Sequence, residues 1–267
     1  MASFCLMAIA IRELHGQVSV AQILLVRSVI GLLVIASIIY LSQKPVLFTT
    51  QKPGLHTLRN LFHFTGQYGW IIGIGALPLA EVFALEFTVP IWTILIAAVL
   101  LGEPVTRRKL AALALGIAGV LVIVQPGRGV FDPVSLIVLG AAVCYAVSHT
   151  CTKHMALTEK PITILFFMCL VQLPVGVVLS VNDWQWPQYQ HWLWLVLIGL
   201  SALTAHFGLA KAMHYAELGK VVTLDFLRLP VIALAGVWLY QEPLEASLLL
   251  GGGLMLLANM VNLRQRK

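Results

Sequence analysis

The fold of this chain is decided by one stretch, Leu79–Lys109, which reads LAEVFALEFTVPIWTILIAAVLLGEPVTRRK. About twenty of its residues are almost wholly apolar, and a helix of that length rises about 30 Å, the thickness of the hydrocarbon core of a bilayer. The stretch ends in Gly-Glu-Pro, followed by the basic run Arg107-Arg108-Lys109. It therefore predicts one membrane-spanning helix with its basic end in the cytoplasm.

Two residues inside this span are unusual for a helix that faces lipid. Glu86 carries a charge into the apolar segment, and Pro90 removes a backbone hydrogen bond. Both indicate that the helix faces other parts of the protein.

The composition extends this interpretation to the whole chain. Of 267 residues, 60% are hydrophobic and 10% are charged, and the mean hydropathy is +0.92. Soluble domains contain about 25% charged residues. The apolar residues form long blocks instead of the alternation that a β-barrel requires. We therefore expect an all-α integral membrane protein.

The apolar blocks predict ten membrane-spanning helices. They are Met1–Ile11, Val20–Leu41, Leu58–Ala76, the apolar part of Leu79–Lys109, Lys109–Gln125, Pro133–Thr152, Pro161–Val181, Trp192–Met213, Val221–Tyr240 and Ala246–Leu263. The first block is too short to span a bilayer. We expect a first helix truncated by a late start codon or an incomplete chain, with a naturally short helix as the alternative.

The basic residues predict the orientation. With a cytoplasmic N-terminus, thirteen Lys and Arg residues lie on the cytoplasmic side, whereas the outer loops hold only Arg12 and Arg128. This bias follows the positive-inside rule and places both termini in the cytoplasm, with the chain in the inner membrane. Four tryptophans then form an aromatic belt at the outer interface: Trp184, Trp186, Trp192 and Trp194.

Charge placement and missing motifs argue against several protein classes. The net charge of +6 comes from short basic clusters between apolar blocks, which orient helices and do not indicate nucleic-acid binding. The sequence has no Walker A, dinucleotide-binding, zinc-protease or serine-hydrolase motif. Its four cysteines lie in apolar blocks without a CxxC pair, so we expect them to pack as small hydrophobic residues. We expect neither a cofactor nor a metal.

Parts of the opening stretch recur 139 residues later. Glu103-Pro104 recurs as Glu242-Pro243, and Glu86-Phe87 recurs as Asp225-Phe226. Five predicted spans separate the copies, and because five is odd the copies have opposite orientations. This predicts two inverted repeats, residues 1–127 and 128–267, the architecture that secondary transporters use for alternating access. Matching Lys153 to Arg12 leaves about ten residues, 132–141, without an N-terminal counterpart.

These features resemble a known family. Val20–Arg27 (VAQILLVR), residues 77–124 with Gly-Glu-Pro, and residues 216–243 with Gln-Glu-Pro are similar to the EamA family of the drug/metabolite transporter superfamily. The resemblance implies ten helices in two inverted five-helix repeats around a central cavity, which move small metabolites, often outward. Asp225 and Arg228 depart from the commonest pattern, since they place two charges in the ninth span.

Charged groups within a membrane normally face a cavity or a partner. Glu86 lies about 10 Å from the outer end of its span, Asp225 lies about as deep from the inner end, and Arg228 follows one turn later. We expect the two acids to act as gates or proton-coupling groups. Arg228 would bind a substrate carboxylate or pair with each acid in turn. The alternative is a structural ion pair between Asp225 and Arg228.

Polar residues at helical spacing indicate surfaces that face the bundle interior. The first stripe comprises Arg59, His63, Gln67 and Trp70, and the second comprises Tyr145, Ser148 or His149, and Thr152. His206 titrates near neutral pH in its unperturbed state, which suits proton coupling. Substrate contact and hydrogen bonding between helices both remain open for the stripes, as does a packing role for His206.

Two further groups are expected to be structural. Arg27, which matches the family's arginine in the second span, is expected to extend toward the outer surface. Gly116, Gly119 and the run Gly251-Gly252-Gly253 allow close helix contact, which leaves a homodimer interface open.

We therefore expect a secondary active transporter and not an enzyme. It would export a small polar metabolite, such as an amino acid or a related zwitterion, driven by protons or by the substrate's own gradient. An intramembrane enzyme and a non-transporting scaffold or sensor are the alternatives, although the sequence shows neither a catalytic pair nor an added soluble domain. The inverted repeat argues against a channel.

Overall fold

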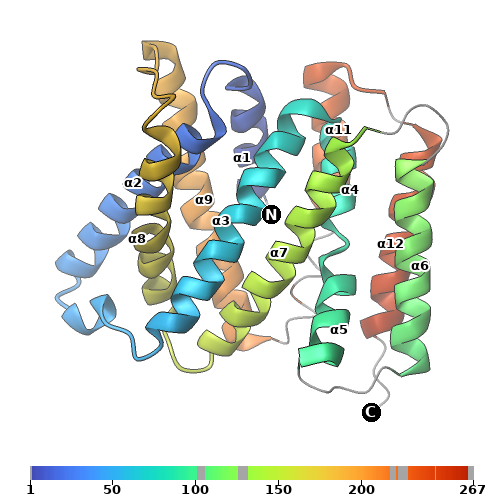
Figure 1. Ribbon diagram of the computed structural model, residues 1–267, viewed down its shortest axis with the longest axis horizontal. Coiled ribbons are helices and arrows are strands. Elements are labelled where there is room, and N and C mark those ends of the chain that lie inside the picture. Colours follow the sequence, from blue (N-terminus) through green and yellow to red (C-terminus); the bar gives the residue numbers. More distant parts are fainter. Residues whose placement is uncertain are drawn as a thin grey trace.

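The computed structural model of the chain describes residues 2–100, 106–125, 132–216, 221, 228–243 and 245–263. Every regular element in these ranges is a helix, and the helices stand side by side in a bundle (Figure 1). They are α1 (Ala2–Glu13), α2 (Val20–Leu41), the 3-10 turn η1 (Pro45–Phe48), α3 (Pro53–Ala76), α4 (Leu79–Glu86), α5 (Val89–Leu100), α6 (Arg107–Val124), α7 (Val134–Met155), α8 (Pro161–Ser180), α9 (Tyr189–Tyr215), α11 (Arg228–Tyr240) and α12 (Ala246–Leu263). The predicted all-α class is confirmed.

Length and hydropathy identify membrane-spanning candidates directly. Within the described ranges, α2, α7, α8 and α9 are long and apolar enough to cross a bilayer, and shorter apolar helices include most of α6, α11 and α12. Three of the four cysteines are buried as free thiols and one is half-buried, as expected for small packing residues.

Local sequence explains where several helices begin. The Ser19 hydroxyl caps α2 by accepting a hydrogen bond from the Gln22 N–H at 3.3 Å. Pro53 and Pro161 start α3 and α8, at a position where a helix needs no N–H donor. Because α3 begins before the predicted Leu58, Arg59 lies in the second turn of the helix and is buried there.

The prediction of one continuous helix from Leu79 was wrong. The stretch forms α4 and α5, which are separated at Phe87 and Thr88. A continuous helix would need an N–H from Pro90 to the carbonyl of Glu86, and proline has none. The Thr88 carbonyl instead starts α5 by accepting from the Ile91 N–H at 2.8 Å. Glu86 is therefore the last residue of a short helix, where the backbone changes course.

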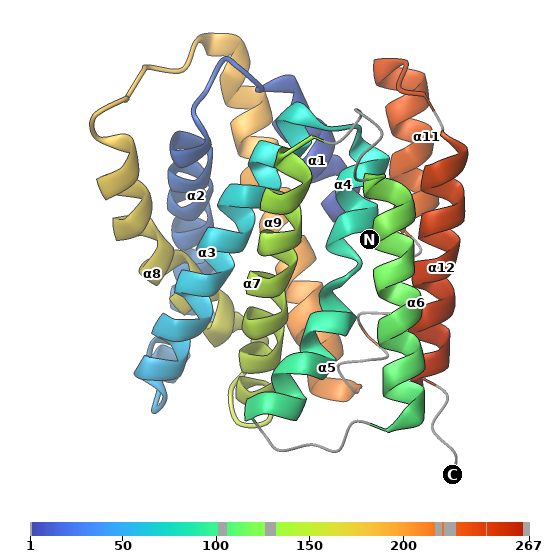
Figure 2. The same ribbon diagram turned by 45° about the vertical axis from the view of Figure 1, so that its right-hand side comes forward.

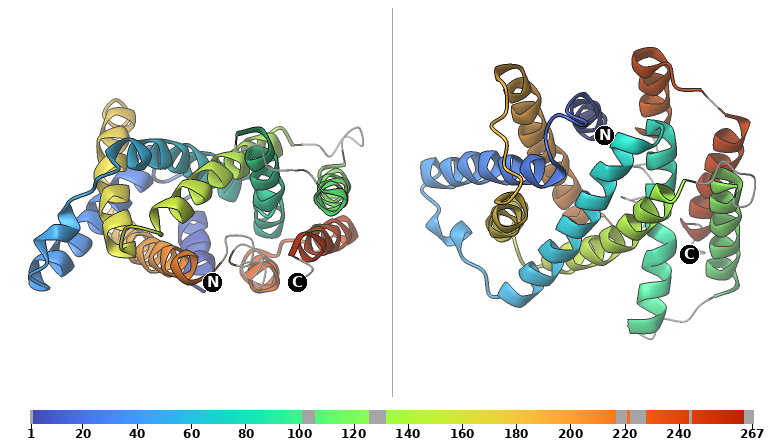
Figure 3. Two further views of the ribbon diagram at one scale, coloured as in Figure 1. Left: turned by 90° about the horizontal axis from the view of Figure 1, so that it is seen from below. Right: turned by 45° about the horizontal axis from the view of Figure 1, so that its top comes forward.

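Most of the packing in the bundle is between pairs of helices that are far apart in the sequence. Extensive contacts join α3 to α7, α1 to α9, α2 to α8, α6 to α12 and α4 to α11. Figures 2 and 3 show α6 and α12 together at one side of the bundle, with α2 and α8 at the other side. Every residue of α4 except Glu81 is buried, so this helix lies inside the bundle and carries Glu86 with it.

Glycines allow a close contact between α6 and α12. A Cβ atom on Gly119 of α6 would lie 2.8 Å from the carbonyl oxygen of Gly251 on α12, and a Cβ on Gly251 would lie 2.7 Å from the carbonyl oxygen of Gly119. Only glycine permits this approach. The expected close contact thus lies within the chain, whereas Gly253 is exposed with open space around it.

Candidate functional site

The polar stripe of α3 lies inside the bundle. Arg59, His63, Gln67 and Trp70 are each no more than 2% exposed. The opposing helix α7 approaches closely because Gly66 has no side chain: a Cβ there would lie 3.1 Å from the Tyr145 ring. The predicted inward orientation of this stripe is confirmed.

The stripe of α7 meets the stripe of α3. The Tyr145 ring lies 5.9 Å from the His63 ring and stacks on the His149 ring at 6.0 Å, centroid to centroid. Thr152 accepts a hydrogen bond from Arg59 Nε at 3.1 Å. Aromatic and imidazole rings from two helices therefore form one wall of a common interior surface.

His206 of α9 completes this wall. Its ring lies 4.7 Å from the His63 ring at an interplanar angle of 75°, and its Nε2 lies 3.4 Å from Gln67 Nε2. The Phe4 ring of α1 contacts it edge-on at 5.4 Å. His206 thus packs among rings and also faces a polar neighbour, which leaves both of its expected roles open.

An ion pair lies at the end of α4. Glu86 accepts hydrogen bonds from Trp70 Nε1 at 2.9 Å and from Arg228 Nη2 at 2.6 Å. The two charged residues are 8% and 3% exposed. Three phenylalanine rings surround the Arg228 guanidinium at 4.7 to 5.3 Å, namely Phe4, Phe83 and Phe87. The desolvated pair therefore has aromatic faces for additional cation–π stabilisation.

These side chains enclose a small cavity of about 20 Å³. Its lining includes Gln67, Trp70, Glu86, Tyr145, His149 and His206, together with Phe4 and Met7 of α1. This volume suits a single water molecule and is far too small for a metabolite. The structure thus represents a closed form of this interior surface.

The structure brings most of the predicted site together. Glu86, Arg228, His63, Gln67, Trp70, Tyr145, His149 and His206 lie in or directly against the cavity. Asp225 lies outside the described residues, so the structural ion pair between Asp225 and Arg228 stays a prediction. Whether these residues bind or couple transport stays a prediction.

Sequence reasoning missed other members of the polar interior. Arg27 was expected to extend to the surface, but it is 4% exposed and donates to Gln172 Oε1 of α8. Gln172 is fully buried and also bonds His63 Nδ1 at 2.8 Å. The available signal was Gln172 itself, because an amide within an otherwise apolar span requires a partner.

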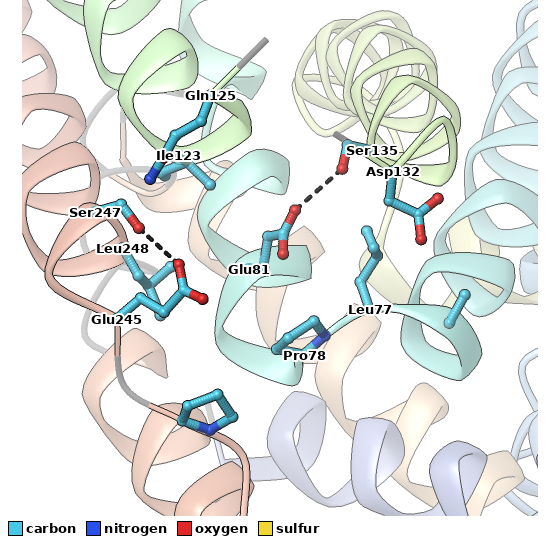
Figure 4. A pocket seen from close by; sticks show the side chains of 12 residues that line it. Leu77, Pro78, Glu81, Ile123, Gln125, Asp132, Ser135, Glu245, Ser247 and Leu248 are labelled. Carbon is cyan, nitrogen blue, oxygen red and sulfur yellow. Dashed lines mark hydrogen bonds between the residues drawn. The ribbon is translucent and has the colours of Figure 1, made fainter. Parts of the chain in front are cut away.

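A second pocket lies at the bundle end where α3 meets α4 (Figure 4). Its volume is about 230 Å³, and its lining includes the carboxylates of Glu81, Asp132 and Glu245. Glu81 accepts from the Ser135 hydroxyl and Glu245 from the Ser247 hydroxyl, each at 3.0 Å. None of the residues predicted for the site lines this pocket. In the described part of the chain, no group of His, Cys, Asp and Glu is arranged to hold a metal.

Comparisons with known proteins support a transporter. The model of the EamA-like transporter family matches residues 1–125 and 133–264. The S-adenosylmethionine uptake transporter of Rickettsia bellii is 25% identical over 79% of this chain and 72% of its own length. The riboflavin transporter of Vibrio cholerae is 29% identical over 78% of this chain and 71% of its own length.

Two further matches extend over nearly the whole chain. The pseudopaline exporter of Pseudomonas aeruginosa is 24% identical over 99% of this chain and 93% of its own length. A solved crystal structure shares the fold with a TM-score of 0.69 at 19% identity, covering 98% of this chain and 93% of that chain. Because the family model matches both halves of the sequence, the chain belongs to the EamA-like transporter family and is an integral membrane protein.

Proposed function

We propose that this chain is a secondary active transporter that exports a small zwitterionic metabolite, such as an amino acid or a derivative, by alternating access. The observation that carries this proposal is the buried Glu86–Arg228 pair, which joins α4 to α11 at the break between α4 and α5. Broken helices and intramembrane charges together mark the substrate sites of secondary transporters. A zwitterion offers both a cation for Glu86 and an anion for Arg228.

Two inverted repeats, residues 1–127 and 128–267, provide the alternating geometry. Under this equivalence α1 to α3 correspond to α7 to α9, α4–α5 to the region that includes α11, and α6 to α12. The contact of α3 with α7 then has its counterpart in the contact of α9 with α1, while α2–α8 and α6–α12 are each their own counterparts. The observed neighbours thus support the repeat.

Arg12 and Lys153, which the sequence repeat pairs, support it further. Arg12 donates to the carbonyls of Gly75 and Leu77 at the end of α3, at 3.1 and 2.8 Å. Lys153 donates to the carbonyls of Met213 and Ala216 at the end of α9, both at 2.8 Å. Leu77 and Ala216 are the C-cap residues of α3 and α9, so two matched cations bind matched helix ends.

The orientation and the driving force belong to the same proposal. Positive residues place both termini in the cytoplasm of an inner-membrane protein, which makes the Arg12 end of the bundle the outer end. Glu86 and His206 line the cavity and are the candidate proton-coupling groups. Export follows the sequence resemblance, and uptake is the second candidate because relatives from Rickettsia are named as uptake transporters.

The test begins with ligand identification. Purified protein is screened by thermal shift against amino acids, S-adenosylmethionine and riboflavin, and each stabilising compound is then followed as a radiolabelled solute in proteoliposomes of known protein orientation. We expect saturable flux that responds to an imposed pH gradient if protons drive it. If no compound of the panel enters proteoliposomes faster than it enters vesicles without protein, the result contradicts the proposal.

A further inference from the structure

A second polar cluster lies nearer the start of α3 than the Glu86–Arg228 pair does. It comprises Arg27, Arg59, Asn60, Thr152 and Gln172, and we call it the Arg27–Arg59 cluster. Arg27 of α2 donates to Gln172 Oε1 at 2.5 Å, and Gln172 Nε2 donates to the backbone carbonyl of Asn60 at 3.4 Å. Arg59 donates to Asn60 Oδ1 at 2.6 Å and to Thr152 Oγ1 at 3.1 Å. One hydrogen-bonded network from four helices therefore holds two cations.

Both guanidinium groups have only neutral partners in the described part of the chain. Arg27 and Arg59 are 4% and 2% exposed, yet no carboxylate pairs with either of them there. Three arginines and one glutamate are the buried charged side chains in that part, and the glutamate is engaged by Arg228. The two cations also repel each other. Burial of unpaired charge is costly, so this arrangement lacks a negative charge.

Unused hydrogen-bonding atoms lie in and beside the same cluster. Arg27 Nη1, His63 Nε2 and Ser148 Oγ are buried without a hydrogen-bond partner among the described residues. His63 belongs to the network through its bond to Gln172, and Ser148 lies one turn from Thr152 on α7. Buried polar atoms are normally satisfied, and such exceptions indicate a missing partner.

We infer that the Arg27–Arg59 cluster binds an acid group of the transported substrate, a carboxylate or a phosphate. This inference rests on the proposed transport function and names the substrate class. An anion supplies the missing negative charge, accepts charge-assisted hydrogen bonds from the guanidinium groups, and accepts from neutral His63 or Ser148. Lysine, as a point charge, does not reproduce the fork geometry of arginine.

The spacing of residues along α3 indicates the direction in which the substrate lies. Arg59 and Trp70 are separated by about 16 Å along the helix axis, from eleven residues at about 1.5 Å each. Trp70 bonds Glu86, so the cluster and the Glu86–Arg228 pair lie toward different ends of one interior surface, with His63 and Gln67 between them. A substrate held by an acid group at the cluster therefore extends along this surface toward the Glu86–Arg228 pair.

The test uses inorganic phosphate as the probe on the full chain in detergent. Thermal unfolding is measured in phosphate and in chloride of equal ionic strength for the wild type, Arg59→Met, Arg27→Met and the exposed-cation control Lys211→Met. We expect phosphate to raise the melting temperature of the wild type and of Lys211→Met by about 2–4 °C. The rise should be absent in Arg59→Met and Arg27→Met.

Melting in chloride separates this role from a purely structural one. Removing an unpaired buried cation should leave the melting temperature of Arg59→Met equal to or above that of the wild type, whereas a structural role predicts a lower value. If Arg59→Met does not fold, Arg59→Lys provides the comparison, with a reduced phosphate shift expected. An absent shift in the wild type, or equal shifts in all variants, would overturn the inference.

The flux assay keeps the two proposals distinguishable. Saturable metabolite flux together with equal phosphate shifts in wild type and Arg59→Met would retain transport and reject the anion subsite. A phosphate shift that depends on Arg59, without flux of any metabolite, would retain the subsite and reject transport.

Discussion

Arg12 and Glu242, which are 230 residues apart in sequence, form an ion pair at one end of the bundle. Glu242 also accepts a hydrogen bond from the Leu79 N–H at the start of α4, at 2.8 Å. One carboxylate therefore joins the end of α1, the start of α4 and the segment after α11. This contact closes the end of the bundle that we propose to face outward.

Replacing Glu242 with Gln should loosen this end. The change removes the ion pair and weakens the bond to Leu79, which costs roughly 1–3 kcal/mol for a half-buried charged hydrogen bond. We expect the melting temperature in detergent to fall by several degrees. Glu245→Gln is the matched control, since Glu245 is exposed and its carboxylate bonds only the Ser247 hydroxyl among the described residues. Equal melting of both variants would contradict a closing role for Glu242.

Lys153→Met should destabilise the opposite end of the bundle. The ammonium group satisfies two carbonyls at the end of α9, and its removal leaves them without these donors at a cost of roughly 1–3 kcal/mol. Arg12→Met should cost at least as much at the end of α3, since it also removes the ion pair with Glu242. Lys160→Met, at an exposed position, serves as the control in the same unfolding measurement. Wild-type stability of Lys153→Met would remove this support for the repeat.

Gly119→Ala and Gly251→Ala should both separate α6 from α12. Each new methyl group would meet a backbone carbonyl at less than 3 Å, and overpacking of this kind costs about 1–3 kcal/mol. Gly253→Ala has open space and should be neutral or stabilising by up to about 1 kcal/mol, because alanine favours helix. Thermal unfolding of the three variants decides the matter, and an equal loss of stability in all three would disprove the close-contact explanation.

Hydropathy and periodicity predicted the fold class and most of the interior surface. The spacing of His63, Gln67 and Trp70 placed one face of α3 inward, and the structure brings that face against Tyr145 and His206, as helical periodicity allows. Glu86 stood out because a charge within an apolar span requires a partner. Its partner Arg228 lies 142 residues away, and that distance in sequence is bridged only by tertiary packing.

The same rules failed where the outcome depended on tertiary contacts. Hydropathy could not show the break after Glu86, since the segments on both sides of it are apolar. Arg27 was expected to reach the surface because depth was counted along its own helix, and that count contains no information about Gln172 on α8. The predicted start at Leu58 placed Arg59 in the first turn of its span, and the packing of α7 and α8 against α3 buries it.

Metabolite flux in the Arg228→Gln variant tests the central claim most directly. The compound that stabilises the wild type in the thermal-shift screen is followed into proteoliposomes that contain equal amounts of wild type, Arg228→Gln or the exposed-site control Lys211→Gln. Loss of the buried cation removes the charged partner of Glu86, so we predict a flux at least about 100-fold lower in Arg228→Gln, equivalent to roughly 3 kcal/mol, with normal membrane insertion. Lys211→Gln should transport as the wild type does. Wild-type flux in Arg228→Gln would contradict the assignment of the Glu86–Arg228 pair to transport.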